Sequence, residues 1–288
     1  MENFSFFNYL AYISYNGFEY SGFQIQKKEN SVQNQIEQVL YKLNKKFLDE
    51  NEVKNNKMIN NLLRIQFAGR TDAKVHAIEN VISFSSFKKY STEKLIEIFN
   101  NNLPVSIRFN KIIETDKRIN PRYLAVERVY IYIIYKGNKF LPFIKNFVYH
   151  YKNYIDIAKM KISLSLFNGT HNFINFTTSL EKRNPVRTIY DTKVMEKDNF
   201  IFIIIRGNSF LHKQVRFIIG TSLLHATNKI EIDYIKQLLN PEPLLKENFP
   251  KKSLFVVPAE GLYLAKVRFQ NDPPVDYEEF NLANFLIS

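Results

Sequence analysis

One short segment of the sequence gathers residue types that serve nucleophilic and acid–base chemistry. The segment FAGRTDAKVHA, from Phe67 to Ala77, places an arginine, a carboxylate and a histidine between apolar neighbours. A carboxylate such as Asp72 can act as a nucleophile, a general base or a metal ligand, and a nearby arginine favours its ionised form. Glycine and aspartate are also common turn residues, so Arg70 and Asp72 equally fit a solvated turn with a local ion pair. No strong pattern of metal ligands surrounds His76, which we expect to be structural.

A second segment, ERVYIYIIY, is aromatic and has the alternation of a strand. Tyr130, Tyr132 and Ile134 fall on one face of that strand, and Ile131 and its alternate neighbours fall on the other. A buried strand explains these tyrosines. A sheet that stacks a tyrosine on a nucleic-acid base explains them as well.

A third segment, RGNSFLHKQVRFIIG, concentrates positive charge where a strand passes into a helix. It carries Arg206, His212, Lys213 and Arg216. Phosphate binding at the start of the helix and a solvated helix face are both compatible with this charge. Arg216 differs from the others because it lies within an apolar run.

Composition limits the class of protein. The chain has 288 residues, 45% of them hydrophobic and 24% charged, which is ordinary for a folded protein long enough for two domains. It has 40 Lys and Arg against 28 Asp and Glu, a net charge of +12. This charge attracts polyanions, of which nucleic acid is the first candidate and an anionic membrane surface the second. A general lysine-rich bias explains the same charge. The lack of cysteine excludes disulfides, thiolate metal sites and cysteine nucleophiles.

The N-terminal residues lack a basic region and a continuous apolar stretch, so we expect no signal peptide. The most apolar run, FIFIII, is too short to cross a bilayer. We therefore expect a cytoplasmic protein without a membrane partner.

Hydrophobic spacing predicts an α+β fold with largely antiparallel sheets and helices on one face. In the first half it predicts a strand over 7–15, a helix over 31–48 capped by Ser31, strands over 63–70 and 80–87, and a helix over 91–104. In the second half it predicts a strand over 129–137, a helix over 156–169, a hairpin over 189–207, helices over 211–226 and 232–243, and a strand over 262–269. Two domains are expected, 1–115 and 116–288.

Seven segments, taken in order, resemble blocks of the tRNA pseudouridine synthase A (TruA) family. The opening ISYNGFEYSGFQIQ with SVQNQIE is similar to the family's YDGxxFxGWQxQ and TVQxxLE, and AGRTDAKVHA is similar to AGRTDAGVHA. The others are AVERVYIYIIY, FNGTHNFINF, RNPVRTI, GNSFLHKQVRFIIG and PAEGLYLAKVRF. A GRTD tetrapeptide alone is a weak signal, whereas seven ordered blocks over nearly the whole chain are specific.

The resemblance implies roles for five residues. Asp72 is the catalytic nucleophile, and Arg216, rather than its sequence neighbour, pairs with it and keeps it ionised. Arg70 helps to position RNA or to displace the target base. Tyr130 stacks on the flipped uracil or assists proton transfer, and Leu262 contributes to the apolar floor of the pocket.

Lys74 is the main departure from the family pattern, which usually has glycine at that position. If the backbone there has a positive φ, lysine costs stability. Alternatively, Lys74 adds a phosphate contact. Phe23, Asn16 and Asn172 replace the usual tryptophan, aspartate and acidic residue, and none of these changes removes a residue with an implied role.

The implied reaction is isomerisation of uridine to pseudouridine in the anticodon stem-loop of tRNA, at positions 38 to 40 of the tRNA. The C1′–N1 bond breaks and a C1′–C5 bond forms, without a metal or other cofactor. The target base must flip out of its stack, and basic surface binds the phosphates. Whether Asp72 attacks C1′, adds to C6 or promotes a glycal stays open. The implied fold has two α/β halves around a central basic cleft, and the implied assembly is a homodimer.

Three other interpretations compete with this one. A non-catalytic tRNA-binding or tRNA-folding protein on the same fold needs the charge and the aromatic cleft but not Asp72. A metal-dependent nuclease requires clustered carboxylates, which the sequence does not offer. A role at a membrane surface requires a basic amphipathic helix, and the only candidate, 34–48, fits better as a helix packed on a sheet.

Overall fold

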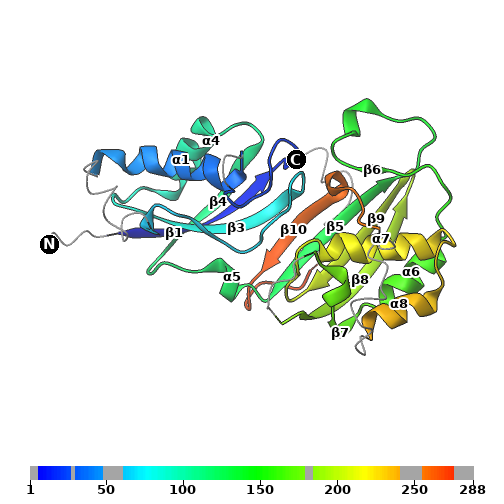
Figure 1. Cartoon of the computed structure of the whole chain (residues 1–288). Coiled ribbons are helices and arrows are strands. Elements are labelled where there is room, and N and C mark those ends of the chain that lie inside the picture. The colour runs from blue at the N-terminus through cyan, green and yellow to red at the C-terminus, as the bar shows by residue number, and fades with distance from the viewer. Residues whose placement is uncertain (1–5, 27–29, 48–60, 179–183, 241–254, 276–288) are drawn as a thin grey trace.

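A single sheet runs along the whole molecule in the computed structural model, which describes residues 6–26, 30–47, 61–178, 184–240 and 255–275 (Figure 1). The order of its strands is β4-β1-β3-β10-β5-β9-β8-β7, with β2 added to β3 and β6 added to β5. The described strands are β1 (Phe7–Tyr15), β2 (Gln66–Phe67), β3 (His76–Ser86), β4 (Ile107–Thr115), β5 (Glu127–Tyr135), β6 (Tyr149–His150), β7 (Gly169–Asn172), β8 (Val186–Lys197), β9 (Phe200–Gly207) and β10 (Leu262–Arg268). Neighbouring strands are antiparallel except for β10 with β3 and β5 with β6.

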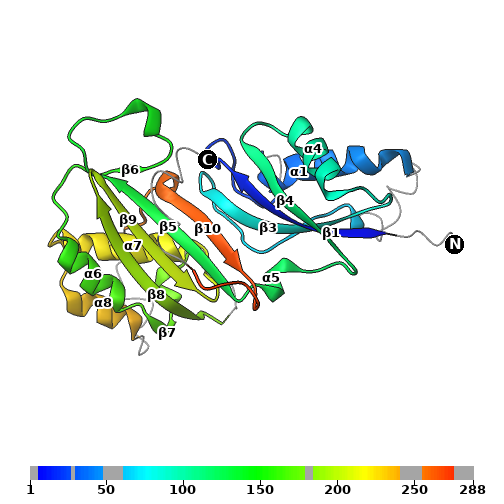
Figure 2. The same ribbon diagram turned by 180° about the vertical axis from the view of Figure 1, so that it is seen from behind.

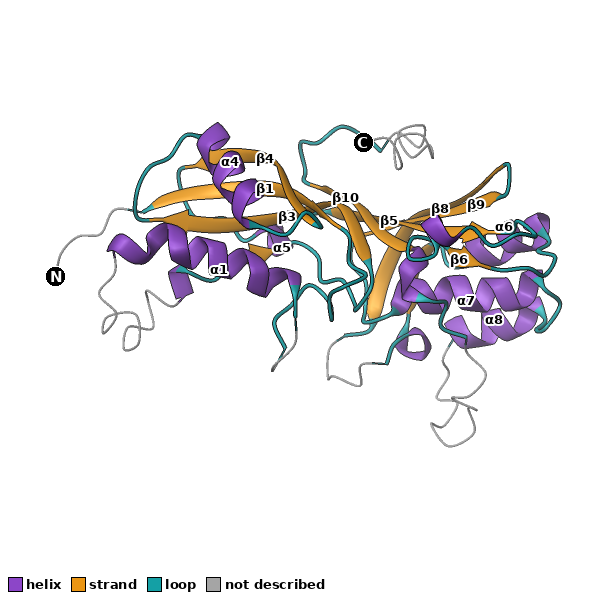
Figure 3. Ribbon diagram, turned by 90° about the horizontal axis from the view of Figure 1, so that it is seen from above, coloured by secondary structure: helices purple, strands orange, loops and turns teal. Residues whose placement is uncertain are grey.

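Helices α1, α7 and α8 lie on one side of this sheet (Figure 3). The described α-helices are α1 (Val32–Asn44), α4 (Thr92–Asn102), α5 (Pro121–Leu124), α6 (Ile157–Ser165), α7 (Gln214–Ala226) and α8 (Ile232–Leu239). Seen from above, α1 lies below the strands of the first half, and α7 and α8 lie below those of the second half (Figure 3). Seen from behind, the strands lie in front of these helices (Figure 2). The α+β class with a largely antiparallel sheet is therefore confirmed.

Local sequence explains where the main elements begin. The hydroxyl of Ser31 accepts a hydrogen bond from the backbone N–H of Asn34 and caps α1, as predicted. Ser91 caps α4 in the same way. Every residue of β5 is buried, because its two faces enter two apolar clusters, with Tyr130 in one and Ile131 in the other.

Several predicted boundaries were wrong. No strand was predicted over Ile107–Thr115, which forms β4 at the edge of the sheet. Its polar residues face solvent there and interrupt the apolar alternation. The predicted strand over 63–70 is reduced to Gln66–Phe67, since the chain then leaves the sheet to form the loop that carries Asp72. Helix α6 ends at Ser165, and Gly169, with a φ of 101°, starts β7 instead of stopping the helix.

Some predictions are not decided by these elements. The charged connection predicted over 49–61 lies, except for its last residue, outside the described residues. The division at residues 115 and 116 stays a prediction. Across the described ranges no helix is both long and apolar enough to cross a membrane.

Candidate active site

The loop between β2 and β3 carries Asp72 and is held by the segment that follows β1. Gly22 and Asp72 form an isolated antiparallel bridge. The N–H of Phe23 donates to the carbonyl of Thr71 at 3.0 Å, and the hydroxyl groups of Thr71 and Tyr15 are 2.8 Å apart. These contacts fix the backbone on both sides of the carboxylate, so Asp72 is not part of a freely moving turn.

The same loop contains a strained residue. Lys74 has a φ of 64°, the left-handed conformation in which glycine meets no steric penalty. Its backbone N–H donates to the carbonyl of Tyr20 at 3.2 Å. Its ammonium lies 5.2 Å from the centre of the Phe18 ring, a cation–π contact. Lys74 therefore has the positive φ that costs stability in a lysine, and two local contacts hold it in this left-handed conformation.

The two oxygens of Asp72 face two different donors. Oδ2 lies 3.5 Å from Nη1 of Arg216, and Oδ1 lies 3.4 Å from Nε2 of His212. Nε of Arg216 donates to the carbonyl of Val257 at 2.8 Å, which holds the guanidinium in place. The side chain of Asp72 is 20% exposed and that of Arg216 is 13% exposed, so the pair is shielded but open to a ligand. Arg216 therefore lies beside Asp72, as the resemblance implies, and its role in keeping the carboxylate ionised stays a prediction.

Tyr130 forms a buried wall next to this carboxylate. Its ring contacts the ring of Phe210 edge to face, with 5.1 Å between centroids and an interplanar angle of 83°. Burial raises the pKa of the Tyr130 phenol, and the negative charge of Asp72 raises it further. The phenol therefore stays protonated at neutral pH, which suits stacking or hydrogen-bond donation and argues against action as a base.

The other two predicted residues have different environments. Arg70 is exposed on the loop, two residues before Asp72. Leu262 is buried at the start of β10, opposite Tyr132 of β5. The next inward residue of that strand, Leu264, approaches Gly69 so closely that a Cβ there would lie 2.8 Å from its Cδ2 atom. Strand β10 thus supplies an apolar support beneath the loop, and the roles of Arg70 and Leu262 stay predictions.

His76 is structural in its contacts. It is 2% exposed. Its Nδ1 accepts from the N–H of Gly17 at 3.1 Å, so its ring proton lies on Nε2, which faces the carbonyl of Asn146 at 3.0 Å. Burial lowers its pKa from 6.5 to about 4. Within the described residues, no group of three or more His, Cys, Asp and Glu side chains is arranged to hold a metal ion.

The basic cluster expected from the third segment is divided in the structure. Arg206 pairs with Glu127, a carboxylate 2% exposed that also binds Arg268. His212, by contrast, reaches Asp72. Sequence reasoning missed this contact, because it grouped His212 with the phosphate-binding candidates.

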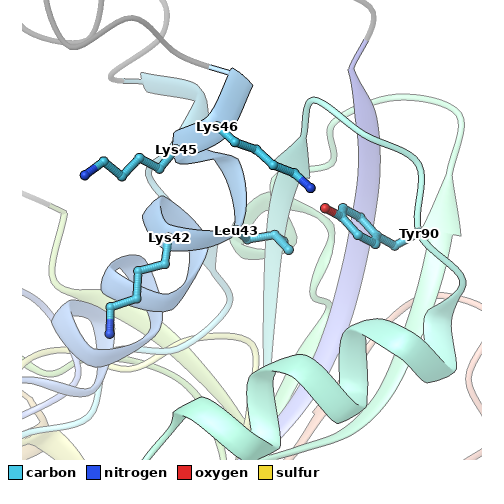
Figure 4. Close-up of a pocket in the computed structure, with 5 residues that line it drawn as sticks. All are labelled: Lys42, Leu43, Lys45, Lys46 and Tyr90. Atoms are coloured by element: carbon cyan, nitrogen blue, oxygen red, sulfur yellow. The ribbon is translucent and has the colours of Figure 1, made fainter.

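A separate basic hollow lies at the end of α1. Its volume is about 580 Å³, and it is lined by Lys42, Leu43, Lys45, Lys46 and Tyr90. Figure 4 shows the side chain of Lys46 directed toward the phenol of Tyr90, whereas Lys42 and Lys45 point away from it. Lys88 adds its ammonium 5.6 Å from the centre of the Tyr90 ring.

Comparison with known proteins identifies the family. The sequence model of the family described as tRNA pseudouridine synthase matches residues 11–123 and 164–270. The chain is 32% identical over 263 residues to tRNA pseudouridine synthase A of Pseudothermotoga lettingae, covering 91% of this chain and 99% of the relative. It is 32% identical over 262 residues to tRNA pseudouridine synthase A 1 of Bacillus cereus, covering 90% and 97%.

One similar solved structure is a Cbf5-Nop10-Gar1 complex, with 16% identity and a TM-score of 0.28, where the match covers 60% of this chain and 39% of that chain. The sequence relatives and the family match, which together span most of the chain, decide the assignment. The chain belongs to the tRNA pseudouridine synthase family.

Proposed function

We propose that this protein isomerises uridine to pseudouridine in tRNA, with Asp72 as the nucleophile. The observation that carries the proposal is the carboxylate of Asp72, fixed on a clamped loop and facing Arg216 from the other end of the chain. A solvated turn would need neither the clamp nor this distant partner. The family to which the chain belongs supplies the reaction class.

The residues of the site divide the work of the reaction. The target base, flipped out of its stack, lies against Tyr130, whose raised pKa keeps the phenol neutral. Arg216 pairs with the charge of the Asp72 carboxylate when RNA excludes water. The glycosidic C1′–N1 bond breaks, a C1′–C5 bond forms, and the proton lost from C5 is balanced by one gained at N1. Attack at C1′, addition to C6 and formation of a glycal all use the same ionised carboxylate and stay alternatives.

The proposed substrate is the anticodon stem-loop, at positions 38 to 40 of the tRNA. The net charge of +12 supports a polyanionic partner. The exposed Arg70 beside Asp72 supports RNA contact at the site itself. The lysines of the hollow at the end of α1 offer further phosphate contacts away from it.

A homodimer in the cytoplasm belongs to the same proposal. Exposed apolar side chains gather around α5, where Tyr123 is 81% exposed and Leu124 and Val126 are also exposed. The phenol of Tyr190, exposed as well, donates to the carbonyl of Val126 and extends this surface. An apolar surface of this kind supports contact with a second copy.

The alternative is a tRNA-binding or tRNA-folding protein that performs no chemistry. Pseudouridine mapping on tRNA incubated with the wild type and with Asp72→Asn, without added metal or cofactor, separates the two. We expect pseudouridine in the anticodon arm with the wild type only, and unchanged tRNA affinity in the variant. A wild type that binds tRNA without forming pseudouridine would favour the alternative.

A further inference from the structure

We propose that His212 is a positioning residue for Asp72, and that Thr178 fixes its imidazole ring. The inference rests on the proposed function, because it assigns His212 to the orientation of the attacking carboxylate. It differs from both interpretations of the basic segment, which were phosphate binding at the start of the helix and a solvated helix face.

The first argument is the placement of donors around the carboxylate. Arg216 approaches Oδ2 and His212 approaches Oδ1, so each oxygen has its own cationic or N–H partner. The terminal torsion of an aspartate is broad and roughly two-fold, and a single donor leaves it free to swing. Two donors on different oxygens hold the plane of the carboxylate and decide which lone pair faces the base. Arg216 makes a long hydrogen bond to the carboxylate, and Nε2 of His212 lies within ion-pairing distance of it. Catalytic contacts are often long or poorly aligned without substrate and tighten when the substrate binds.

The second argument concerns the protons on the imidazole. Nδ1 of His212 lies 2.6 Å from the hydroxyl of Thr178. A hydroxyl can donate or accept, so it satisfies Nδ1 whether or not that atom carries a proton. Nε2 faces a carboxylate and must carry a proton for an attractive contact. The Thr178 hydroxyl therefore permits neutral and charged forms of His212 that both donate from Nε2 to Asp72.

The third argument is the rigidity of the backbone that carries both donors. Lys213, with a φ of 60°, makes the sharp bend between His212 and the start of α7. The side chain of Gln214 accepts from the N–H of Leu211 at 2.7 Å and closes this bend. The hydroxyl of Thr177 donates to the carbonyl of His212 at 3.0 Å. The two donors of Asp72 thus come from one braced turn at the beginning of a buried helix.

A phosphate contact is the competing role, since the side chain of His212 is 49% exposed. The two roles predict different kinetics. A positioning residue acts on the rate of the bound complex, whereas a phosphate contact acts on affinity. Misplacement of a reacting group by about 1 Å can cost on the order of 100-fold in rate.

The experiment measures the single-turnover rate of pseudouridine formation at saturating tRNA and, separately, the Kd for tRNA. We expect His212→Leu to lower the rate about 10- to 100-fold with a Kd within about twofold of the wild type. His212→Gln, whose amide N–H can replace Nε2–H, should recover much of the loss. His171→Leu is the matched control and should keep the wild-type rate, because His171 lies on β7 and bonds the carbonyl of Asn168 just before that strand.

A mutant cycle tests the link to Thr178. We expect Thr178→Val to lower the rate less than His212→Leu, since Thr178 acts only through the ring. The double variant should be no slower than His212→Leu, because coupled residues are not additive. Additive losses would overturn the part assigned to Thr178.

Two outcomes would overturn the role of His212. One is a wild-type rate in His212→Leu, and the other is a raised Kd with an unchanged rate, which would make His212 an RNA contact. A wild type that forms no pseudouridine would overturn the proposed function together with this role. An active wild type with an unaffected His212→Leu would overturn the positioning role alone. Thermal unfolding of each variant shows whether it is folded.

Discussion

Acid should destabilise the fold through His76, which lies four residues from Asp72. The buried imidazole accepts from the N–H of Gly17 through Nδ1. Protonation would place a second donor against that N–H and a charge in a buried site. The pKa of His76 is therefore lowered from 6.5 to about 4.

The sign and the size of the effect follow from proton binding. Between pH 6.5 and pH 4 His76 is protonated in the unfolded chain but neutral in the folded chain. The free energy of unfolding therefore falls as the pH falls. The stabilisation is fully present above pH 6.5. At 1.36 kcal/mol for each pKa unit, the total loss is about 3 kcal/mol, of which about 1.5 kcal/mol is lost between pH 6.5 and pH 5.

Urea unfolding at pH 6.5, 6.0, 5.5 and 5.0 tests this prediction in the range where few carboxylates titrate. His76→Asn is the comparison, because its amide oxygen can accept from Gly17 but does not titrate. We expect the variant to be less stable at pH 6.5 and to lose about 1.5 kcal/mol less than the wild type by pH 5. Equal pH dependence in the two proteins would refute the assignment of this titration to His76.

Two further perturbations test the loop and the basic surface. Lys74→Gly should raise the free energy of unfolding by about 0.5 to 1 kcal/mol in urea, since relief of the left-handed strain exceeds the entropy that glycine costs. The control is Asn228→Gly, at another residue whose φ is positive. A lower free energy of unfolding in Lys74→Gly would contradict the inference that Lys74 is strained. Replacing Lys42 and Lys46 by Gln should reduce the slope of log affinity for tRNA against log salt by about 2, while the single-turnover rate at saturation is unchanged. An unchanged salt slope would exclude these lysines from the RNA interface.

Strong local signals in the sequence predicted much of the fold. Alternation over β1 and the Ser31 cap of α1 were correct because both depend on neighbouring residues. The predicted hairpin over 189–207 is present as β8 and β9, and it turns at Asp198, which has a φ of 53°. Strand β4 was missed because an edge strand shows only part of its length to the core.

The candidate site could be predicted only in part, and the reason is the distance along the chain. Residue types in the segment around Asp72 were compatible with a reactive carboxylate and also with a solvated turn that pairs it with Arg70. The choice of Arg216 came from the family resemblance, and the structure places that residue, 144 positions away, at the carboxylate. His212, which contacts Asp72, is followed by Lys213, whose positive φ bends the chain before α7. Sequence spacing does not indicate such a φ at a lysine.

The surroundings of Asp72 come from segments that lie far apart along the chain. Its loop is clamped by Gly22 on one side, and its charge is met by Arg216 and His212 on the other. The sheet connects the loop of Asp72 with the second half of the chain. Strand β10 pairs with the start of β3, directly after the loop, and also with β5, which carries Tyr130. A carboxylate on the first half alone would be a polar turn with an ordinary environment. The pairing of β10 with both strands brings the two halves together around Asp72, with Arg216 and His212 as its charge partners and Tyr130 as its aromatic wall. Perturbations of β10 should therefore change the reaction rate before they change the affinity for tRNA.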